Sequence, residues 1–405
     1  MGPRTLLRAW GRHYADACRD LPRPIWHIAL VALVSRSGQM VLPYLLLYLI
    51  EAREFSKGDA GLVLAGVGLA GMAGQQIGGA VADRVGPRSV QIVTLFGAAL
   101  LYLGIWALPT AATLVVGLLL LSLVGEAFRP ANLAAISGFT TAVERPRAIA
   151  LQRLAVNVGV TFGPIVGGFL ADLDYDYLFL VNGAVWLVSA VLLTFLSRSW
   201  PEIDRTPPQD DPALDRSPWR DRVLLVFLLV NVSVAFCFMQ FQSGMTIELR
   251  EGYGFDKSTI GVAFAMNTVL IVLFEMPLWK KLAGRDNLVL CALGAALTGV
   301  GIALTPLGST LAFAWATVAV WTLGEMLHAT SSWSFVAERA GPRYRGRYMG
   351  AMGASFGLAV AVAPIAGTQL YDSGALWWLC AALGLFAAAL SFALRPHVRR
   401  ERASR

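Results

Sequence analysis

Five ionisable side chains lie inside long apolar runs of this sequence, where a charge is costly. They are Arg36, Glu126, Arg129, Glu275 and Glu325. Charged residues are rare within apolar segments of membrane-spanning length, and by default they indicate a functional site. A carboxylate in such a place can carry a proton, and an arginine can hold an anion or pair with the carboxylate. These residues are the first candidates for chemistry.

Two of these acids have a charged or titratable neighbour three residues further along the chain. Glu126 precedes Arg129 and Glu325 precedes His328, so each pair shares one helix face. An arginine at short range favours the ionised carboxylate, which argues against Glu126 as a proton carrier while the pair lasts. Histidine titrates near neutrality, so Glu325 and His328 could exchange a proton at physiological pH. Alternatively, both pairs are polar contacts that only position helices.

Two further charges leave alternatives open. Arg36 could bind an anionic group of a substrate, or it could pair with Glu126. Glu275 lies about one turn from Lys280, and it is either a second proton-carrying acid or the partner of a basic residue there. We expect no metal site, because no cluster of liganding residues accompanies any of these acids.

Aromatic and methionine side chains occur in the same apolar runs as the charges. Such side chains form adaptable surfaces that suit amphipathic or varied ligands. In a membrane helix, however, an aromatic residue more often serves packing or interfacial anchoring. The candidates for substrate contact, besides Arg36 and Arg129, are Tyr44, Tyr48, Phe236, Phe238, Met239, Phe241, Met266 and Trp333.

The elements that must position these residues are apolar segments long enough to cross a bilayer, for which about 20 helical residues suffice. Of the 405 residues, 56% are hydrophobic and only 15% are charged, a composition that requires lipid as solvent. We therefore predict an all-α membrane protein with twelve transmembrane helices. The predicted spans are 26–50, 59–82, 89–109, 112–137, 147–171, 176–197, 222–249, 258–280, 287–305, 309–336, 346–371 and 374–395.

A polar, proline-broken segment separates six of these spans from the other six. Lys and Arg concentrate in this segment, at both termini and in alternate loops, so the positive-inside rule places all of them in the cytoplasm. We expect a multi-pass protein of the plasma (inner) membrane. Its predicted parts are an interfacial segment at 1–25, six-helix bundles at 26–197 and 222–396, a linker at 198–221 and a basic tail at 397–405.

The two predicted bundles resemble copies of each other. Several residues recur at a near-constant offset of 199 or 200 positions. Six spans is an even number, so both copies enter the membrane in the same sense and form a parallel repeat. The matching pairs are Gln75 and Glu275, Glu126 and Glu325, Pro164 and Pro364, Gly167 and Gly367, and Asp172 and Asp372.

The loop after the second span contains Gly79-Ala-Val-Ala-Asp83-Arg84-Val-Gly86-Pro87-Arg88. It resembles the signature G-x-L-A-D-R-x-G-R-K of the major facilitator superfamily, from which Val81 and Pro87 depart. The resemblance implies two six-helix bundles in which helices 1, 4, 7 and 10 line a central cavity. It also implies that this loop, with Gly79, Asp83, Arg84, Gly86 and Arg88, forms a cytoplasmic conformational latch.

In such a latch, Asp83 contacts helix 11. In this sequence Arg345 and Arg347 lie at the beginning of that helix. The resemblance implies that this contact holds the outward-open state. The alternative is that the charges of the loop only enforce the topology.

The fifth span contains Gly159-x-x-x-Gly163-Pro164-x-x-Gly167-Gly168, which resembles the antiporter motif of drug:proton exchangers. Ala150 stands where that motif usually begins with glycine. Glycines at four-residue spacing make a smooth stripe for close helix packing, and the proline allows a bend. The alternative is a helix crossing with no further role.

The resemblance implies a secondary active transporter that works by alternating access. Our first expectation is proton-coupled export of drugs or amphiphilic small molecules, with Glu325, His328, Glu126 and Glu275 as candidate proton-coupling residues. The alternative is a dedicated carrier of a sugar, lipid or organic anion. No nucleotide-binding loop or nucleophile–base pattern occurs, so we expect neither an enzyme nor ATP drive. The expected partners are a small-molecule substrate, protons and the bilayer, without nucleic acid, nucleotide or cofactor, and the expected state is a monomer.

Overall fold

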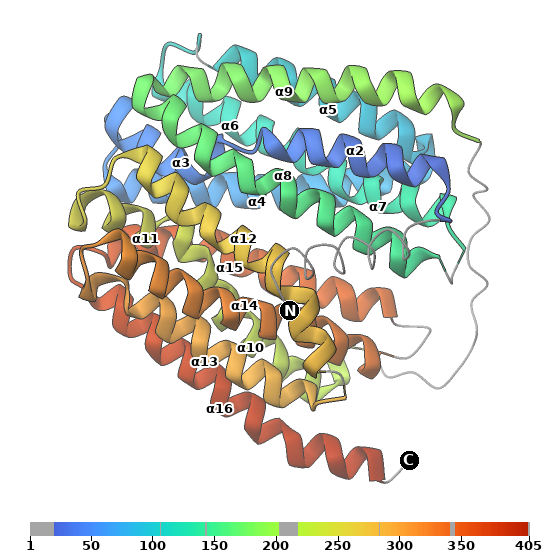
Figure 1. Ribbon diagram of the computed structural model, residues 1–405, viewed down its shortest axis with the longest axis vertical. Coiled ribbons are helices and arrows are strands. Elements are labelled where there is room, and N and C mark those ends of the chain that lie inside the picture. The colour runs from blue at the N-terminus through green and yellow to red at the C-terminus, as the bar shows by residue number, and fades with distance from the viewer. Residues whose placement is uncertain are drawn as a thin grey trace, which may run out of the picture. The chain divides into compact units, whose positions relative to one another are not determined.

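The computed structural model describes residues 20–105, 107–141, 144–201, 218–282, 284–340 and 345–403. These ranges form helices and connecting turns, without any strand in the part of the chain described (Figure 1). Most of the predicted interfacial segment and of the linker, residues 1–19 and 202–217, lie outside the described residues. So do the side chains of Lys280 and Arg345, on which two of the predictions depended.

The first half of the sequence forms eight α-helices and two short helical turns within the described ranges. Their bounds are α2 (Arg23–Ser37), α3 (Val41–Leu47), η1 (Tyr48–Ala52), α4 (Lys57–Val85), α5 (Pro87–Ile105), α6 (Ala111–Glu126), α7 (Phe128–Phe139), α8 (Arg145–Leu173), α9 (Tyr175–Leu196) and η2 (Ser197–Ser199).

The second half repeats this pattern of long helices joined by short turns. The elements are η3 (Pro218–Arg220), α10 (Arg222–Met239), η4 (Gln240–Gln242), α11 (Gly244–Ile247), η5 (Glu248–Gly252), α12 (Lys257–Leu282), α13 (Asn287–Ala303), η6 (Thr305–Leu307), α14 (Leu311–Arg339), α15 (Arg345–Gln369) and α16 (Ala375–Ala403).

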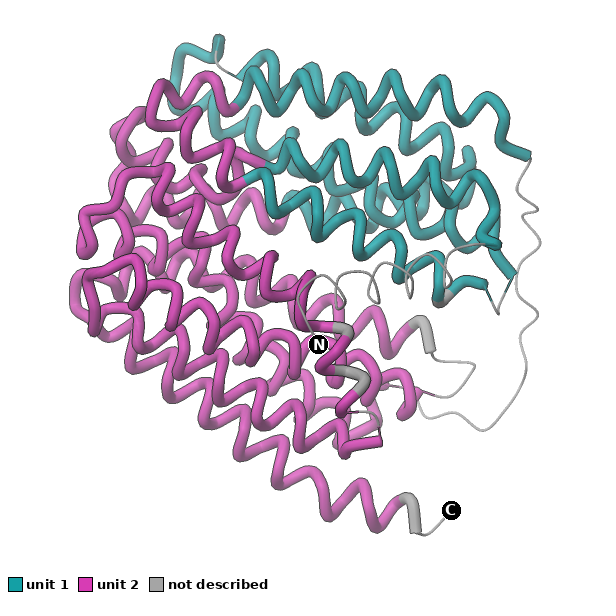
Figure 2. The backbone as a smooth tube through the Cα atoms, viewed as in Figure 1, with its two compact units in different colours: residues 1–39, 70–163, 179–207 teal, residues 40–69, 164–178, 208–405 magenta. Residues whose placement is uncertain are grey.

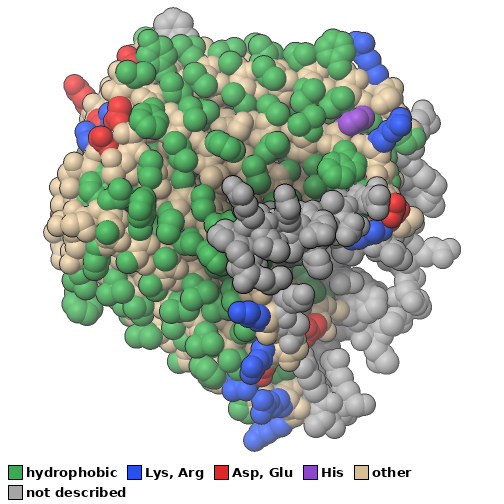
Figure 3. All heavy atoms as spheres, in the orientation of Figure 1, with side chains coloured by type: hydrophobic (Ala, Val, Ile, Leu, Met, Phe, Trp, Pro, Cys, Tyr) green, Lys and Arg blue, Asp and Glu red, His purple; other side chains and the backbone are tan. Residues whose placement is uncertain are grey.

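Ten helical segments of the described residues are long and apolar enough to cross a membrane. Helix α13 is apolar but has only 17 residues, and α14 is not among the ten. The prediction of an all-helical, multi-spanning protein is therefore confirmed, while the number of twelve spans stays a prediction. On the face drawn in Figure 3, hydrophobic side chains cover much of the described surface, as a lipid-facing protein requires.

Two predicted spans are broken by a proline in the first turn of the following helix. Span 26–50 breaks between α2 and α3, where Pro43 follows, and span 112–137 breaks at Ala127, just before Pro130. A proline has no N–H to donate and its ring clashes with the carbonyl four residues earlier, so one helical hydrogen bond is lost at each of these places. The second of these turns, at Ala127, keeps helical backbone angles and lies between Glu126 and Arg129.

The chain divides into two compact units, which Figure 2 shows in different colours. Unit 1 contains residues 1–39, 70–163 and 179–207, and unit 2 contains residues 40–69, 164–178 and 208–405. Segments 40–69 and 164–178 of the first half thus pack with the second half of the sequence. The predicted division into two six-helix bundles stays a prediction.

Within unit 1, glycines of α4 allow close packing on α6. A Cβ atom on Gly74 would overlap the carbonyl group of Leu123, and one on Gly78 would lie 2.6 Å from the Cα atom of Ala127. Only a residue without a side chain permits this backbone approach. The crossing brings Gln75 of α4 to Glu126 at the end of α6.

Within unit 2, helix α13 packs closely on α14 and α16. A Cβ atom on Gly294 would lie 2.6 Å from the backbone nitrogen of His328, and one on Gly299 would lie 2.6 Å from the Cα atom of Gly384. The neighbouring core of α10 and α14 contains Phe227 and Phe335, whose ring centroids are 4.6 Å apart. These contacts fix the face that α14 turns toward α13.

Candidate functional site

Glu325, near the middle of α14, is bound by a neutral amide from α12. Asn267 donates a hydrogen bond from Nδ2 to Oε2 of Glu325 at 2.8 Å. The same nitrogen lies 3.0 Å from the hydroxyl of Thr322, one turn earlier on α14. Thr322 is buried, and Glu325 is half-buried. Asn267 of α12 thus links two polar side chains of α14, Thr322 and Glu325.

Four aromatic rings from α10, η4, α12 and α14 contact one another, and two of these helices, α12 and α14, carry Asn267 and Glu325. The ring centroids of Phe238 and Phe241 are 5.2 Å apart, and that of Trp321 is 5.9 Å from Phe238. Phe264 contacts Phe241 edge-on at 5.8 Å. We call Phe238, Phe241, Phe264 and Trp321 the aromatic cluster.

Helix geometry relates the aromatic cluster to the polar residues. Phe264 and Asn267 are three residues apart on α12, and Trp321 and Glu325 are four apart on α14, so each pair shares one helix face. Aromatic faces attract cations, and the attraction increases when water is excluded. A carboxylate beside such rings suits a ligand that carries both a positive charge and apolar surface.

The predicted direct pairing of Glu325 with His328 is not formed. His328 is buried, and neither ring nitrogen has a hydrogen-bond partner among the described residues. A Cβ atom on Gly294 would lie 2.9 Å from the Cβ atom of His328, so this histidine faces α13. The close packing of α13 on α14 therefore takes His328 into a helix interface, while Glu325 is bound from α12.

The predicted pairing of Glu126 with Arg129 is not formed either. No ion pair joins these two described residues, and Arg129 is exposed. Gln75 instead donates a hydrogen bond from Nε2 to Oε2 of Glu126 at 2.8 Å. Glu126 is thus bound from a neighbouring helix, α4, and not by the residue three positions further along the chain.

Arg36 lies in unit 1 within the electrostatic field of two of these residues, Glu126 and Arg129. Glu126 attracts its guanidinium group and Arg129 repels it. Arg36 donates a hydrogen bond from Nη1 to Oε1 of Gln39 at 3.2 Å. Both predicted alternatives for Arg36, anion binding and association with Glu126, are compatible with this placement.

Glu275 lies on α12, in the turn before Pro277. The hydroxyl of Thr330 on α14 is 3.5 Å from Oε1 of Glu275. The side chain of Lys280, its predicted partner, is outside the described part of the chain. The two predicted roles of Glu275 therefore both stay open.

The predicted substrate contacts separate into two groups. Phe238 and Phe241 belong to the aromatic cluster, and Met239 is buried beside them on α10. Trp333 is 44% exposed near the end of α14 and joins none of the ring pairs of the described residues. Phe236 is buried on α10, and Met266 is half-buried next to Asn267.

Tyr44 and Tyr48 belong to the second group, because their polar groups are engaged in packing. The hydroxyl of Tyr44 is 2.6 Å from the carbonyl oxygen of Pro164 and 3.1 Å from that of Lys257. The hydroxyl of Tyr48 accepts a hydrogen bond from Arg53 at 2.7 Å. Both rings are fully buried. Their predicted role as substrate contacts stays a prediction.

The site also contains residues that the sequence analysis missed: Asn267, Thr322, Phe264 and Trp321. The amide of Asn267 was the available signal, because a polar side chain in an apolar span needs a partner. Neutral amides were not among the predicted site residues.

The glycines of the predicted antiporter motif on α8 allow close backbone approaches. In unit 1, a Cβ atom on Gly159 or Gly163 would lie 2.6 Å from the carbonyl oxygen of Leu33 or of Gln39, respectively. In unit 2, a Cβ atom on Gly167 would lie 3.0 Å from Met40. The next residue, Gly168, similarly faces the backbone of Lys257 at the start of α12.

The loop between α4 and α5 has the turn that its sequence predicts. Gly86 has φ +92°, a conformation that favours glycine, and Arg88 donates to the hydroxyl of Ser197 at 3.0 Å. Gly79 packs near Pro130. Asp83 and Arg84 are exposed, and the side chain of Arg345 lies outside the described residues. The predicted latch contact therefore stays a prediction.

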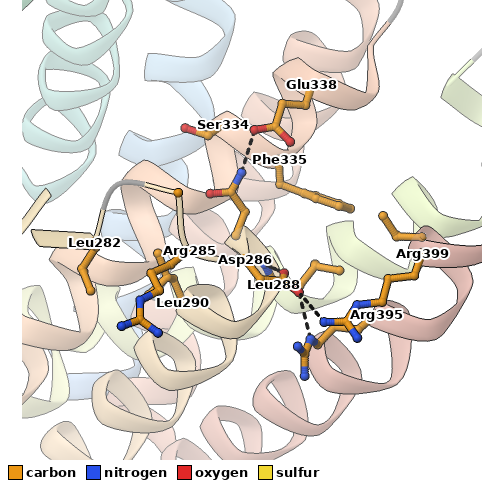
Figure 4. Close-up of a pocket in the computed structure, with 13 residues that line it drawn as sticks. Leu282, Arg285, Asp286, Leu288, Leu290, Ser334, Phe335, Glu338, Arg395 and Arg399 are labelled. Carbon is orange, nitrogen blue, oxygen red and sulfur yellow. Dashed lines mark hydrogen bonds and ion pairs between the residues drawn. The ribbon is translucent and has the colours of Figure 1, made fainter. Parts of the chain in front are cut away.

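A separate pocket of about 600 Å³ lies at one end of α13, α14 and α16, and Figure 4 shows its lining. Asp286 caps α13 and pairs there with Arg395 at 3.0 Å and with Arg399 at 3.8 Å. Asn287 donates to Glu338 at 2.9 Å. Most of its charged groups thus bind one another, and it contains none of the predicted site residues. We assign this pocket a structural role.

Residues 28–364 match the sequence profile of the Major Facilitator Superfamily. The chain belongs to this superfamily. As a major facilitator protein it is a multi-pass membrane transporter of small molecules and not an enzyme. No group of His, Cys, Asp and Glu in the described ranges could hold a metal ion.

Relatives within the superfamily are distant but cover most of the chain. The "Na(+), Li(+), K(+)/H(+) antiporter" of Planococcus maritimus is 25% identical over 400 residues, covering 89% of this chain and 92% of that protein. "Multidrug resistance protein MdtH" of Aeromonas salmonicida (strain A449) is 22% identical over 351 residues, covering 86% and 87%. A solved POT family transporter in complex with 5-aminolevulinic acid has a TM-score of 0.75 at 15% identity, covering 92% and 95%, and it shows the shared fold.

Proposed function

We propose that this major facilitator protein is a proton-coupled antiporter that exports drugs or other amphiphilic small molecules by alternating access. The observation that carries the proposal is the Glu325 carboxylate, bound by the neutral amide of Asn267 and sharing helix faces with the aromatic cluster. Glu325 is the proton-coupling acid in this proposal, and the aromatic cluster contacts the apolar part of the substrate.

The chemistry follows from the partners of Glu325. Its half-buried carboxylate accepts a hydrogen bond from the amide of Asn267, and a carboxyl group can exist in an ionised and in a protonated form. The ionised form attracts a cationic amphiphile, and the protonated form releases it. Proton and substrate binding then compete, which is the exchange that an antiporter needs.

The names of two distant relatives support the proposed antiport of drugs and protons. One is named as a cation/proton antiporter and another as a multidrug resistance protein, and both align with most of this chain. The α8 glycines lie at close helix crossings, as the resemblance to the antiporter motif implies. We infer that α8 couples proton and substrate exchange to helix movement.

The proposal includes the remaining expectations from the sequence. The protein has twelve spans in two repeated bundles and is a monomer in the plasma (inner) membrane. Both termini and the linker are cytoplasmic, because Lys and Arg concentrate in these parts and in alternate loops. The loop with Asp83 is a latch on the same side.

Purified protein in liposomes tests the function directly. We expect an imposed pH gradient to drive accumulation of cationic amphiphilic dyes, and thermal-shift measurements to show binding of the same dyes. Sugars, peptides and organic anions serve as comparison panels. Binding and flux that are confined to one of those panels, without cationic amphiphiles, would contradict drug export.

One observation favours the alternative of a dedicated carrier for an anionic solute. Arg36 is half-buried in α2, and it donates a hydrogen bond to the neutral side chain of Gln39. A buried guanidinium group is suited to a carboxylate or phosphate. Proton-driven flux of organic anions that depends on Arg36 would support this alternative.

A further inference from the structure

Ion pairs in unit 2 connect the two halves of the sequence at η1 and η5, at the starts of α4 and α12, and at the ends of α8 and α15. Residues 51–57 and 172–175 of the first half meet residues 248–258 and 371–372 of the second half. All these residues belong to the same compact unit. The contacts form two clusters, which we name after Glu51 and Lys57.

The Glu51 cluster places three donors around one carboxylate. Arg250 donates from Nε to Oε1 of Glu51 at 2.7 Å, and Nζ of Lys257 lies 3.3 Å from Oε2. The hydroxyl of Tyr175 donates to Oε2 at 2.8 Å. The ammonium group of Lys257 also lies over the ring of Tyr175, 4.2 Å from its centroid. A first-half acid is thus held by two cations of the second half.

The backbone of the second half joins the same cluster. The carboxylate of Asp172 accepts the N–H groups of Lys257 at 3.0 Å and of Ser258 at 2.9 Å. These are the first residues of α12, whose N–H groups have no partner within the helix. A residue from the end of α8 therefore caps a helix of the other half.

The Lys57 cluster has the corresponding arrangement with the halves exchanged. Nζ of Lys57 donates to Glu251 at 2.8 Å and to Asp372 at 3.0 Å. It lies over the ring of Tyr371, 4.9 Å from its centroid, and the hydroxyl of Tyr371 donates to Glu248 at 3.0 Å. A first-half cation is thus held by two acids of the second half.

The two clusters are related by the sequence repeat. Lys57 begins α4 and Lys257 begins α12. Lys57 contacts Glu251 and Asp372 of the second half, and Lys257 contacts Glu51 and Asp172 of the first half. The equivalent residues, all 200 positions apart, are Glu51 and Glu251, Lys57 and Lys257, and Asp172 and Asp372. Members of all three pairs contact residues of the opposite half. Such a repeated arrangement is not expected of accidental surface contacts.

The clusters are unequal in strength. The side chain of Lys257 is 13% exposed and that of Glu51 is 27% exposed, compared with 46% for Glu251 and 72% for Asp372. Arg250 has no equivalent, since Ile50 stands 200 positions earlier. Water weakens an exposed ion pair more than a partly buried one, so the Glu51 cluster contributes more.

We propose that the two clusters form a crossed ionic gate, which holds both halves of the chain together at this end and must break when the end opens. The proposal rests on the alternating access of the proposed function. Opening separates the partners of both clusters at once, because each cluster joins the same two halves. The Glu51 cluster is the main contact, and the Lys57 cluster adds a smaller contribution.

Hydrogen exchange followed by mass spectrometry, on the full protein in nanodiscs without substrate, tests the gate. The readout is exchange of the segment 253–262, which includes the capped amides of Lys257 and Ser258. We expect Glu51→Gln to increase this exchange about tenfold, since it weakens several charge-assisted hydrogen bonds. Its repeat equivalent Glu251→Gln should increase exchange less, by about two- to fivefold, as for an exposed pair.

The matched control is Arg53→Gln, because Arg53 bonds to Tyr48 of its own half. It should leave exchange of 253–262 unchanged. Lys57→Glu alone and Glu251→Lys alone each place like charges together and should increase exchange of 253–262. The double variant restores opposite charges, so its exchange should return toward that of the unchanged protein.

Unchanged exchange in Glu51→Gln would overturn the gate, and so would an equal increase throughout the helices, which indicates general destabilisation. The exchange measurement needs no transported solute, so it is independent of whether the protein transports one. Predicted exchange together with absent proton-driven flux would therefore reject the proposed function and keep the gate. Normal flux with unchanged exchange in Glu51→Gln would reject the gate alone.

Discussion

Asn267 on α12 donates a hydrogen bond to Glu325 on α14 at 2.8 Å, although 58 positions separate them in the sequence. This bond orients the acid that we propose carries the proton. It also distinguishes Glu325 from its repeat equivalent Glu126, which takes its hydrogen bond from Gln75 on α4, two turns away from the position equivalent to Asn267.

We predict that Glu325→Gln abolishes proton-driven transport and removes its pH dependence, because the amide cannot ionise. Substrate binding or exchange without a gradient should persist. The measurement is flux into proteoliposomes with and without an imposed pH gradient. His328→Gln is the matched control on the same helix, since His328 faces α13 and makes no hydrogen bond within the described ranges. A Glu325→Gln protein that still concentrates substrate would move the role to Glu275.

Asn267→Ala should shift the pH profile of transport and leave the protein folded. Removal of a donor from a carboxylate disfavours its charged form, so we expect half-maximal transport to move to higher pH. Flux measured across a pH series, with Asn267→Asp and Met266→Ala for comparison, checks this. An unchanged profile with reduced expression would mean that Asn267 has only a packing role.

Arg36 and Arg129 should differ in their effect on specificity. Arg36 is half-buried in the field of Glu126, whereas Arg129 is exposed. We predict that Arg36→Gln changes the relative transport of anionic and cationic substrates, because loss of a partly buried charge alters the local field most. Arg129→Gln should change it little. Equal selectivity in both variants would assign Arg36 to the scaffold.

The α8 glycines should resist even one added methyl group. Gly163→Ala and Gly168→Ala would each push a Cβ atom into a backbone carbonyl, that of Gln39 or of Lys257, so we expect a loss of about 1–3 kcal/mol in stability and lower flux. Gly353→Ala on α15 is the control, because no atom lies within 4 Å of its added Cβ. Thermal unfolding in detergent measures the difference. Equal melting temperatures in all three variants would refute close packing.

Asp221 should contribute stability that disappears in acid. It caps α10 and binds Arg339 at 2.5 and 2.7 Å and Tyr348 at 2.9 Å. Burial alone would raise the pKa of Asp221, but the hydrogen bonds and charge of Arg339 lower it overall. A lowered folded-state pKa means that the contribution is complete above the ordinary value of about 3.9 and is lost as the pH falls through the lower folded value.

The corresponding variant is Asp221→Ala. We expect a loss of about 3–5 kcal/mol near neutral pH, because it leaves Arg339 largely without its partly buried partner, and a smaller loss in acid. Exposed Asp83→Asn should stay within about 0.5 kcal/mol. Unfolding measured between acidic and neutral pH separates the two. A loss from Asp221→Ala that is the same at every pH would contradict the ionic explanation.

Much of this protein could be predicted from local patterns in the chain. Apolar runs of about 20 residues require helices in lipid, since every backbone group must be satisfied within the segment. Acids such as Glu325 were identifiable because a charge in such a run is costly. The glycine at the turn after α4 and the glycines of α8 were likewise visible, because backbone geometry or close packing requires that residue type.

Tertiary structure alone decided which side chains these residues meet. Spacing along one helix predicted Glu325 with His328 and Glu126 with Arg129, but it does not say which neighbouring helix each face meets. Packing at Gly294 turned His328 toward α13, and the close packing of α4 on α6 brought Gln75 to Glu126. The pairs of Asn267 with Glu325 and of Lys57 with Glu251 join distant segments, so they depend on how helices pack and not on local sequence.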